Sequence, residues 1–201
     1  MRIALFGGSF DPIHHGHLIV ARAVAEQLDI ARVILLPSRT PPHKPHVALA
    51  PPEHRLAMVQ AAIAGDDLFA ASDHDLTCAG PSYTVNTVAH FRRTMPDAEL
   101  CWIVGGDSLR ELHTWYQPDE ITRNCRVVTA VRPGYEVGDL PELAAILPAE
   151  TVAHLRRDVL ETPRIDISAT QVRERVAAHR PIRYLVPAPV ATYIQTHQLY
   201  A

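Results

Sequence analysis

The sequence contains few cysteines, the residues whose disulfide bonds stabilise small secreted domains. It has only three cysteines among 201 residues, Cys78, Cys101 and Cys125. They are odd in number, far apart and outside any C-x-x-C pattern, which excludes a disulfide framework and favours a reducing compartment. We expect all three to be buried or half-buried thiols without a chemical role.

Long apolar runs and long runs of one charge are also missing. The apolar run at the start of the chain, up to Phe6, is too short for the core of a signal peptide. No later run approaches the roughly 20 apolar residues of a membrane span. The net charge is −3, and no basic stretch is long enough for a nucleic-acid surface. We therefore expect a cytoplasmic protein whose partners include neither membranes nor nucleic acids.

Short apolar runs alternate with stretches of helical periodicity along the chain. Hydrophobic residues make up 47% of it, enough for a sizeable core. Strands are expected at residues 3–6, 32–36, 68–71, 99–104 and 126–131. Helices are expected after the first strand, after Ser82 and Ser168 as N-caps, from Glu53, and over about 189–197. The alternation predicts an α/β fold, a doubly wound, mostly parallel Rossmann-like sheet with helices on both faces, in a single domain over residues 1–201.

Three polar segments follow expected strands or begin expected helices. They are Gly7–His17, Gly105–Asp107 and Ser168–Arg173. Ligands of open α/β sheets bind at the carboxyl ends of the strands, so these segments are candidate parts of one site. The Pro-rich loop at residues 37–52 is either a substrate loop or a plain surface excursion.

The first segment has the residue types of an anion site. We expect Gly7 and Gly8 to turn the backbone sharply and to let it approach a ligand. His14 and His17 are three residues apart near a helix start, so they can face the same way and donate hydrogen bonds. The segment is neither a P-loop nor a G-x-G-x-x-G fingerprint. Zinc binding by His14, His15 and His17 is the competing interpretation, but no cysteine lies nearby to complete a structural site.

The other two segments are ambiguous by themselves. Ser168 and Thr170 lie at an expected helix start with Arg173 one turn later, where amides, hydroxyls and a guanidinium can converge on an anion. Ser168 to Gln171 also matches an ordinary capping box. Asp107 can accept a hydrogen bond from a ribose hydroxyl, or it can be a helix N-cap.

Two signatures together resemble a known family. Gly7–His17 resembles the G-G-x-F-D-P-x-H-x-G-H signature of the HIGH-type nucleotidylyltransferases, and Ile167–Arg173 resembles their second signature, I-S-x-T-x-x-R. Nearly the whole chain is similar to the bacterial nicotinate-nucleotide adenylyltransferases of that superfamily. Further matching pieces are Pro41–Lys44, Pro81–Thr84, Gly106–Leu109, Trp115-Tyr116 and Arg132–Gly134.

The resemblance implies a reaction in which ATP and nicotinate mononucleotide give deamido-NAD and pyrophosphate, with Mg²⁺ accompanying ATP. It implies three catalytic residues, His14, His17 and Arg173. The ATP-binding residues that it implies are Gly7, Gly8, Ser9, Phe10, His14, His17, Gly105, Asp107, Ile167, Ser168, Thr170 and Arg173. The residues implied for nicotinate mononucleotide are Ser9, Lys44, Thr84, Trp115, Tyr116 and Arg132. The C-terminal helical part, about 168–201, is expected to complete the ATP site.

Several alternatives stay open at this point. Lys44, with or without His43, would serve either the mononucleotide phosphate or the triphosphate. Trp115 is equally compatible with the core of a short helix. An adenylyltransferase acting on phosphopantetheine is a close rival, and a nucleotide-sensing module without catalysis is a rival of a different class.

Overall fold

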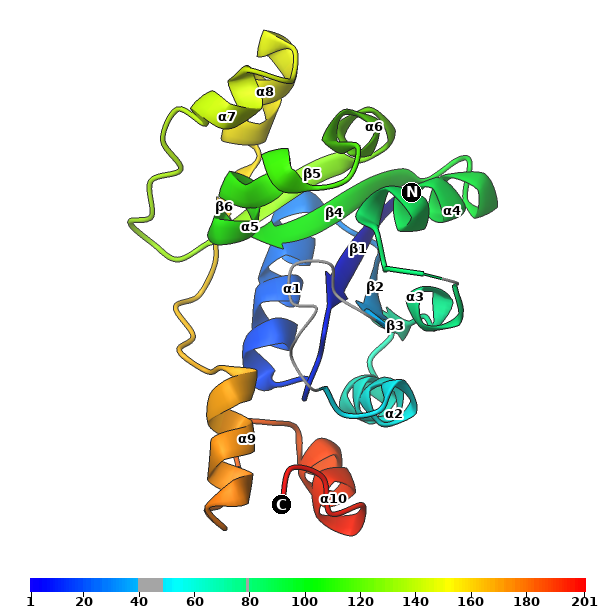
Figure 1. Cartoon of the computed structure of the whole chain (residues 1–201), viewed down its shortest axis with the longest axis vertical. Helices are drawn as coiled ribbons and strands as arrows, with labels where there is room; N and C mark the ends of the chain where they lie inside the picture. Colours follow the sequence, from blue (N-terminus) through cyan, green and yellow to red (C-terminus); the bar gives the residue numbers. More distant parts are fainter. Residues whose placement is uncertain (40–48, 79) are drawn as a thin grey trace. The chain divides into compact units, whose positions relative to one another are not determined.

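The computed structural model describes residues 1–39, 49–78 and 80–201 (Figure 1). His43 and Lys44 lie outside the described residues, so their predicted roles are not addressed by it. None of the described helices is both long and apolar enough to cross a membrane.

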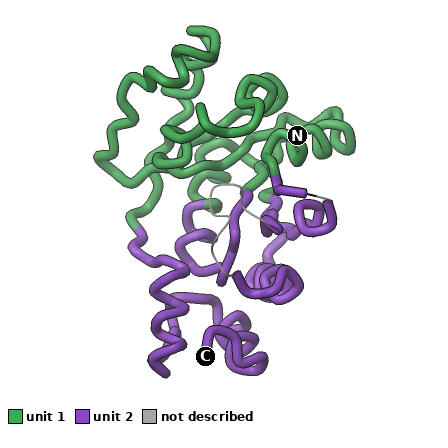
Figure 2. The backbone as a smooth tube through the Cα atoms, viewed as in Figure 1, with its two compact units in different colours: residues 1–6, 21–33, 83–164 green, residues 7–20, 34–82, 165–201 purple. Residues whose placement is uncertain are grey.

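The chain is organised in two compact units (Figure 2). Unit 1 comprises Met1–Phe6, Ala21–Val33 and Tyr83–Arg164. Unit 2 comprises Gly7–Val20, Ile34–Ser82 and Ile165–Ala201. Both sequence signatures therefore fall in unit 2, whereas Thr84, Trp115, Tyr116 and Arg132, which are expected at the mononucleotide, fall in unit 1.

The described strands form one parallel sheet. They are β1 (Arg2–Gly8), β2 (Arg32–Pro37), β3 (Phe69–Ala71), β4 (Glu99–Gly105), β5 (Arg126–Val131) and β6 (Val159–Glu161). Their order is β3-β2-β1-β4-β5-β6, and within unit 1 Ile3 of β1 lies opposite Leu100 of β4. This is the strand order of doubly wound nucleotide-binding sheets, with the topological switch point at β1 and β4. The predicted fold class is confirmed.

The helices alternate with these strands. They are α1 (His15–Leu28), α2 (Pro52–Ile63), α3 (His74–Thr77), α4 (Thr84–Thr94), α5 (Gly106–Glu111), α6 (Pro118–Asn124), α7 (Pro141–Ala144), α8 (Ala149–Arg157), α9 (Ala169–Ala177) and α10 (Ala188–Thr196). A 3-10 turn, Leu112–Thr114, follows α5.

Local sequence signals account for most of these elements. The central residues of β4 are all buried, as a continuous apolar run in a parallel sheet requires. α2 begins with a proline, and Gly65 follows its end with φ +83°. The N-cap prediction for α4 is wrong, because Tyr83 is the N-cap and the Ser82 hydroxyl donates to Asp75 O at 3.2 Å instead.

The sequence did not predict β6 or the helices α6 to α8. β6 has only three residues, which are half-buried or exposed at the edge of the sheet. No continuous apolar run therefore marks it, although it pairs in parallel with β5.

The cysteines have the environments that the sequence predicts. Cys78 is half-buried, and Cys101 and Cys125 are buried, all three as free thiols. Burial raises the pKa of Cys101 to about 11 and that of Cys125 to about 12. Both buried thiols therefore stay protonated and unreactive at neutral pH.

Unit 2 is organised around a buried arginine. Arg55 of α2 is 1% exposed. Its Nη1 donates to Ser9 O and Ser38 O, both at 2.7 Å, and its Nε donates to Ala50 O at 2.9 Å. One guanidinium thus joins the residue after β1, the residue after β2 and the segment leading into α2. Burial lowers the pKa of Arg55, and the nearby Asp11 carboxylate opposes that shift.

Arg55→Met should lower the free energy of unfolding by about 3–5 kcal/mol, because it leaves buried carbonyls and Asp11 without their partner. Urea-induced unfolding would measure the loss. Arg32→Met is the matched control, since Arg32 is exposed and should change stability by no more than about 0.5 kcal/mol. Equal stability of the two variants would contradict the role given to Arg55.

Candidate functional site

The turn of the first signature lies later than predicted. Gly7 and Gly8 are the last residues of β1 and not the turn itself. The chain reverses at Phe10, which has φ 45°, and at the cis Asp11-Pro12 bond. The expectation that the glycines make the turn is therefore wrong, because the strand continues through them.

Gly8 is needed for close packing. A Cβ at Gly8 would lie 3.1 Å from the Phe10 ring, so a side chain there would push that ring away. Phe10 is 1% exposed, and its ring meets His17 edge-on with centroids 5.1 Å apart. The Phe10 side chain therefore orients His17, and a contact between Phe10 and a nucleotide would have to involve its backbone.

The two signature histidines form a stacked pair at the start of α1. Their ring centroids are 3.7 Å apart with an interplanar angle of 27°. The backbone N–H of His14 donates to Nδ1 of His17 at 3.2 Å. Since Nδ1 of His17 is an acceptor, the neutral ring carries its proton on Nε2. His17 is thereby held in the tautomer that can donate from Nε2.

Both histidines are neutral at neutral pH. Burial, with a smaller effect of His15, lowers the pKa of His14 from 6.5 to about 4. Burial and the neighbouring His14 lower the pKa of His17 well below 6.5. In the free protein the pair therefore offers N–H donors to an anion and no positive charge.

The second signature has the predicted capping box. Ser168 is the N-cap of α9, its Oγ accepts from Gln171 N at 3.1 Å, and Gln171 Oε1 accepts from Ser168 N at 3.2 Å. Ile167, half-buried, directly precedes the cap, and Thr170 lies exposed in the first turn. The cap satisfies the amides of Ser168 and Gln171, and the positive end of the helix dipole lies at this end of α9.

Arg173 brings the two signatures together within unit 2. Its Nη1 donates to Asp11 O at 2.7 Å and lies 3.8 Å from Asp11 Oδ2. Its Nη2 donates to Thr170 Oγ1 at 3.4 Å. The guanidinium is therefore placed beside the turn of the first signature, although 162 residues separate it from Asp11.

The segment after β4 belongs to unit 1. Gly105 is the N-cap of α5 and Asp107 lies in its first turn, so the alternative reading of Asp107 as the N-cap is wrong. Both residues are exposed. A Cβ at Gly106 would lie 2.6 Å from the Tyr135 ring. Glycine is thus required at position 106 if Tyr135 keeps its place.

Aromatic side chains gather around the segment assigned to the nicotinate, also in unit 1. Trp115 follows the 3-10 turn and is half-buried, and Tyr116 is 54% exposed. The Tyr116 ring lies 4.9 Å from that of Tyr83, the residue before Thr84 at the start of α4. Arg132 follows β5 with an exposed side chain.

Sequence reasoning missed three polar residues of unit 2. Asp11 lies inside the first signature, so its place in that motif could have marked it as a site residue. Arg55 and Tyr200 have no such signal, because one lies on a helix and the other at the end of the chain. The Tyr200 hydroxyl donates to Asp11 Oδ1 at 2.7 Å across 189 residues of sequence.

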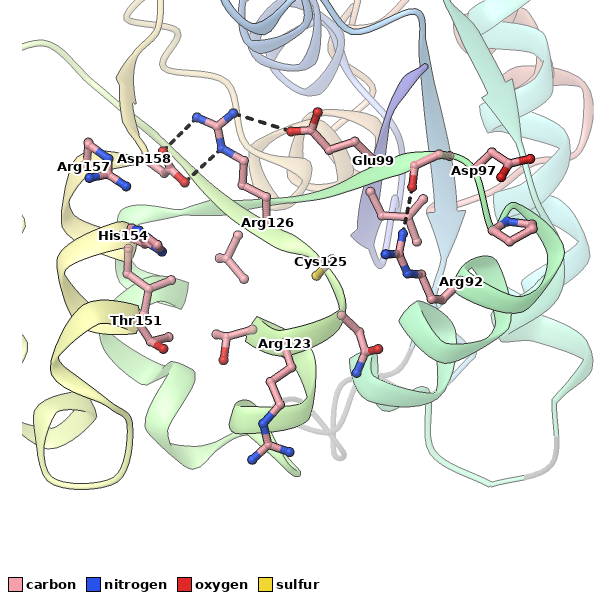
Figure 3. Close-up of a pocket in the computed structure, with 17 residues that line it drawn as sticks. Arg92, Asp97, Glu99, Arg123, Cys125, Arg126, Thr151, His154, Arg157 and Asp158 are labelled. Carbon is pink, nitrogen blue, oxygen red and sulfur yellow. Dashed lines mark hydrogen bonds and ion pairs between the residues drawn. The ribbon is translucent and has the colours of Figure 1, made fainter.

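Unit 1 also contains a polar cavity of about 690 Å³ at the amino ends of β4 and β5 (Figure 3). Two of its arginines, Arg126 and Arg92, already have partners. Arg126 donates to both oxygens of Asp158 at 2.9 and 2.8 Å and lies 3.9 Å from Glu99. Arg92 donates to Ala98 O at 2.8 Å. Substrates of doubly wound sheets bind at the opposite strand ends, so this cavity is assigned no substrate.

Among the described residues, no group of three or more histidine, cysteine, aspartate or glutamate side chains is arranged to hold a metal ion.

Known proteins resemble the chain over almost its whole length. The sequence profile of the cytidylyltransferase-like family matches residues 5–175. The chain is 46% identical over 199 residues to a probable nicotinate-nucleotide adenylyltransferase of Thermomicrobium roseum, covering 99% of this chain and 91% of that protein. It is 40% identical over 200 residues to the protein of the same name from Thermus thermophilus, covering 100% of both.

Solved structures have the same fold. Nicotinic acid mononucleotide adenylyltransferase of Plasmodium falciparum, in complex with NaAD, superposes with a TM-score of 0.75. The match covers 99% of this chain and 97% of that one at 16% sequence identity. At this identity the likeness is one of fold alone.

The neutral histidines predict how stability depends on pH. Because the pKa of His14 is lowered from 6.5 to about 4, the unfolded chain binds more protons than the folded chain between these values. The free energy of unfolding should therefore fall as the pH drops from 6.5 toward 4, by up to about 3 kcal/mol for this residue. Urea-induced unfolding at a series of pH values would measure the slope.

His14→Asn should flatten that slope, because the group that takes up the proton on unfolding is gone. His154→Asn, at an exposed position, is the control for the loss of a histidine as such. An unaltered slope in His14→Asn would show that His14 is not held neutral.

Proposed function

The chain belongs to the nicotinate-nucleotide adenylyltransferases of the cytidylyltransferase-like family, and we propose that it joins ATP and nicotinate mononucleotide to give deamido-NAD and pyrophosphate. One observation carries the proposal. Arg173 of the second signature is hydrogen-bonded to Asp11 of the first, and this contact within unit 2 supports the proposal that both signatures bind the same anion. This activity belongs to NAD biosynthesis.

The chemistry requires no general base. The phosphate of the mononucleotide is already an anion at neutral pH and attacks the α-phosphate of ATP in line, displacing pyrophosphate. The protein must hold the reactants and stabilise charge that develops on the α-phosphate and on the leaving group. Neutral N–H donors of His14 and His17 and the guanidinium of Arg173 are suited to that task.

We assign the ATP phosphates to unit 2. His14 and His17 donate to them from the start of α1, and Arg173 and the first turn of α9, with Ser168 and Thr170, donate from the second signature. Backbone atoms of Gly7 to Phe10 lie along the nucleotide, as does Ile167, the first residue of the second signature. Gly105 and Asp107 contact the adenosine.

The mononucleotide is assigned to the other predicted residues. The nicotinate ring stacks on Trp115 or Tyr116, and its carboxylate accepts a hydrogen bond from Thr84. Ser9, Lys44 and Arg132 serve the remainder of the mononucleotide. The proposal includes a cytoplasmic location and one nucleotidylyltransferase domain over residues 1–201, with residues 168–201 completing the ATP site.

We expect magnesium to bind together with ATP. Mg²⁺ is bound chiefly by phosphate oxygens and water in nucleotide sites, so we propose that MgATP is the species bound. The ion would neutralise part of the charge on the triphosphate.

Pyrophosphate release tests the activity directly. Wild-type protein with MgATP and nicotinate mononucleotide should release pyrophosphate and form deamido-NAD. Nicotinamide mononucleotide and phosphopantetheine, tested in parallel, should be poorer acceptors. Tight ATP binding without turnover on any of the three acceptors would instead identify a nucleotide-sensing module.

His17→Ala should lower kcat by about 10²–10³-fold, since it removes one donor to the developing charge. His15→Ala is a matched control from the same turn, because no role is assigned to the His15 side chain. Thermal unfolding of both variants would verify that they are folded. A folded His17→Ala variant with near-normal pyrophosphate release would refute the assignment.

A further inference from the structure

The carboxylate of Asp11 is enclosed by segments that are far apart in the sequence. Asp11 is 1% exposed. Its Oδ1 accepts from the Tyr200 hydroxyl at 2.7 Å and from Ala50 N at 3.2 Å. Its Oδ2 is buried and has no hydrogen-bond partner within the described structure. The carboxylate is thus held by one oxygen only.

Oδ2, which accepts no hydrogen bond, already forms a long ion pair with Arg173, the side chain on which the proposed phosphate site depends. Arg173 Nη1 lies 3.8 Å from Asp11 Oδ2, beyond hydrogen-bond distance, while it donates to Asp11 O at 2.7 Å. A small rotation of the carboxylate would turn this separation into a hydrogen-bonded ion pair, which is the stronger interaction. Asp11 is therefore poised to compete with a phosphate for Arg173.

The backbone conformation of residues 198–200 positions the Tyr200 hydroxyl next to Asp11. Gln198 and Tyr200 have φ 51° and 65°, left-handed values that side chains other than glycine rarely adopt. Leu199 N donates to Ile194 O at 3.0 Å, which ties this turn to α10. Burial and the hydrogen bond to Asp11 raise the pKa of Tyr200, so its hydroxyl remains a donor at neutral pH.

We propose that Tyr200 is a positioning residue, which holds Asp11 by Oδ1 and so keeps Arg173 available to the phosphates of ATP. Tyr200 touches no substrate and acts through Asp11. The role of Arg173 as a phosphate ligand rests on the proposed function. The hydrogen bond between Tyr200 and Asp11 does not depend on that function.

Tyr200→Phe removes only the hydroxyl and keeps the ring. With only the longer hydrogen bond from Ala50 N left at Oδ1, Asp11 should turn toward Arg173 and weaken ATP binding. We expect the KM for ATP to rise about tenfold, which corresponds to about 1.4 kcal/mol. The KM for nicotinate mononucleotide and kcat should stay within about twofold, since bound ATP has already displaced the Asp11 carboxylate from Arg173.

Tyr193→Phe is the matched control from α10. The Tyr193 hydroxyl lies 2.9 Å from His54 Nδ1, so this variant loses a tyrosine hydroxyl from the neighbouring helix α10 without touching Asp11. It should leave both KM values unchanged. If Tyr200→Phe instead raises both KM values together and lowers Tm more than the control does, the hydroxyl is merely structural and the proposal fails.

Asp11→Asn as a background tests whether the effect passes through Asp11. An amide cannot form the competing ion pair, so adding Tyr200→Phe to Asp11→Asn should change the KM for ATP less than twofold. A tenfold rise in both backgrounds would show that Tyr200 acts by another route and would overturn the proposal.

Calorimetric measurement of ATP binding to the same proteins distinguishes failure of the proposed function from failure of the positioning role of Tyr200. If the wild type releases no pyrophosphate, the proposed function fails. The role of Tyr200 is then decided by the Kd for ATP, which should rise about tenfold in Tyr200→Phe and remain unchanged in Tyr193→Phe. An unchanged Kd in Tyr200→Phe would overturn the positioning role whether or not the protein turns over.

Discussion

The geometry of unit 2 depends on the hydrogen bonds of one buried guanidinium. Arg55 satisfies the carbonyls of Ser9, Ser38 and Ala50, and its charge lies near the buried Asp11 carboxylate. Unpaired carbonyls at these positions would be costly in a site shielded from water. The turn after β1, which carries the first signature, can therefore keep its position only while Arg55 is in place.

The parts of the fold that could be predicted are those with strong local signals. β4 is a continuous apolar run buried on both faces, and the capping box at Ser168 satisfies its own amides. The errors arise where tertiary contacts override local preference. β1 continues through Gly7 and Gly8, and Ser38 N donates to Gly8 O at 2.9 Å at its end. The Ser82 hydroxyl donates to Asp75 O and does not cap α4.

The candidate site was predictable in its residue types and not in its electrostatics. The spacing of His14 and His17 indicates a shared face, but the N–H of His14 determines the tautomer of His17 and burial determines the charge of both. Tyr200 was out of reach because its partner is 189 residues away. No local pattern can indicate a contact that only the folded chain creates.

The uncharged state of the stacked histidines has a consequence for how binding energy is used. A cation would attract the ground-state triphosphate strongly and would hold the pyrophosphate product equally well. A neutral N–H donor interacts more weakly with both, and its hydrogen bond strengthens as negative charge grows on the phosphate oxygens during transfer. In the proposed function, histidines that are neutral in the free protein would therefore place more of their binding energy in the transition state and favour departure of the leaving group.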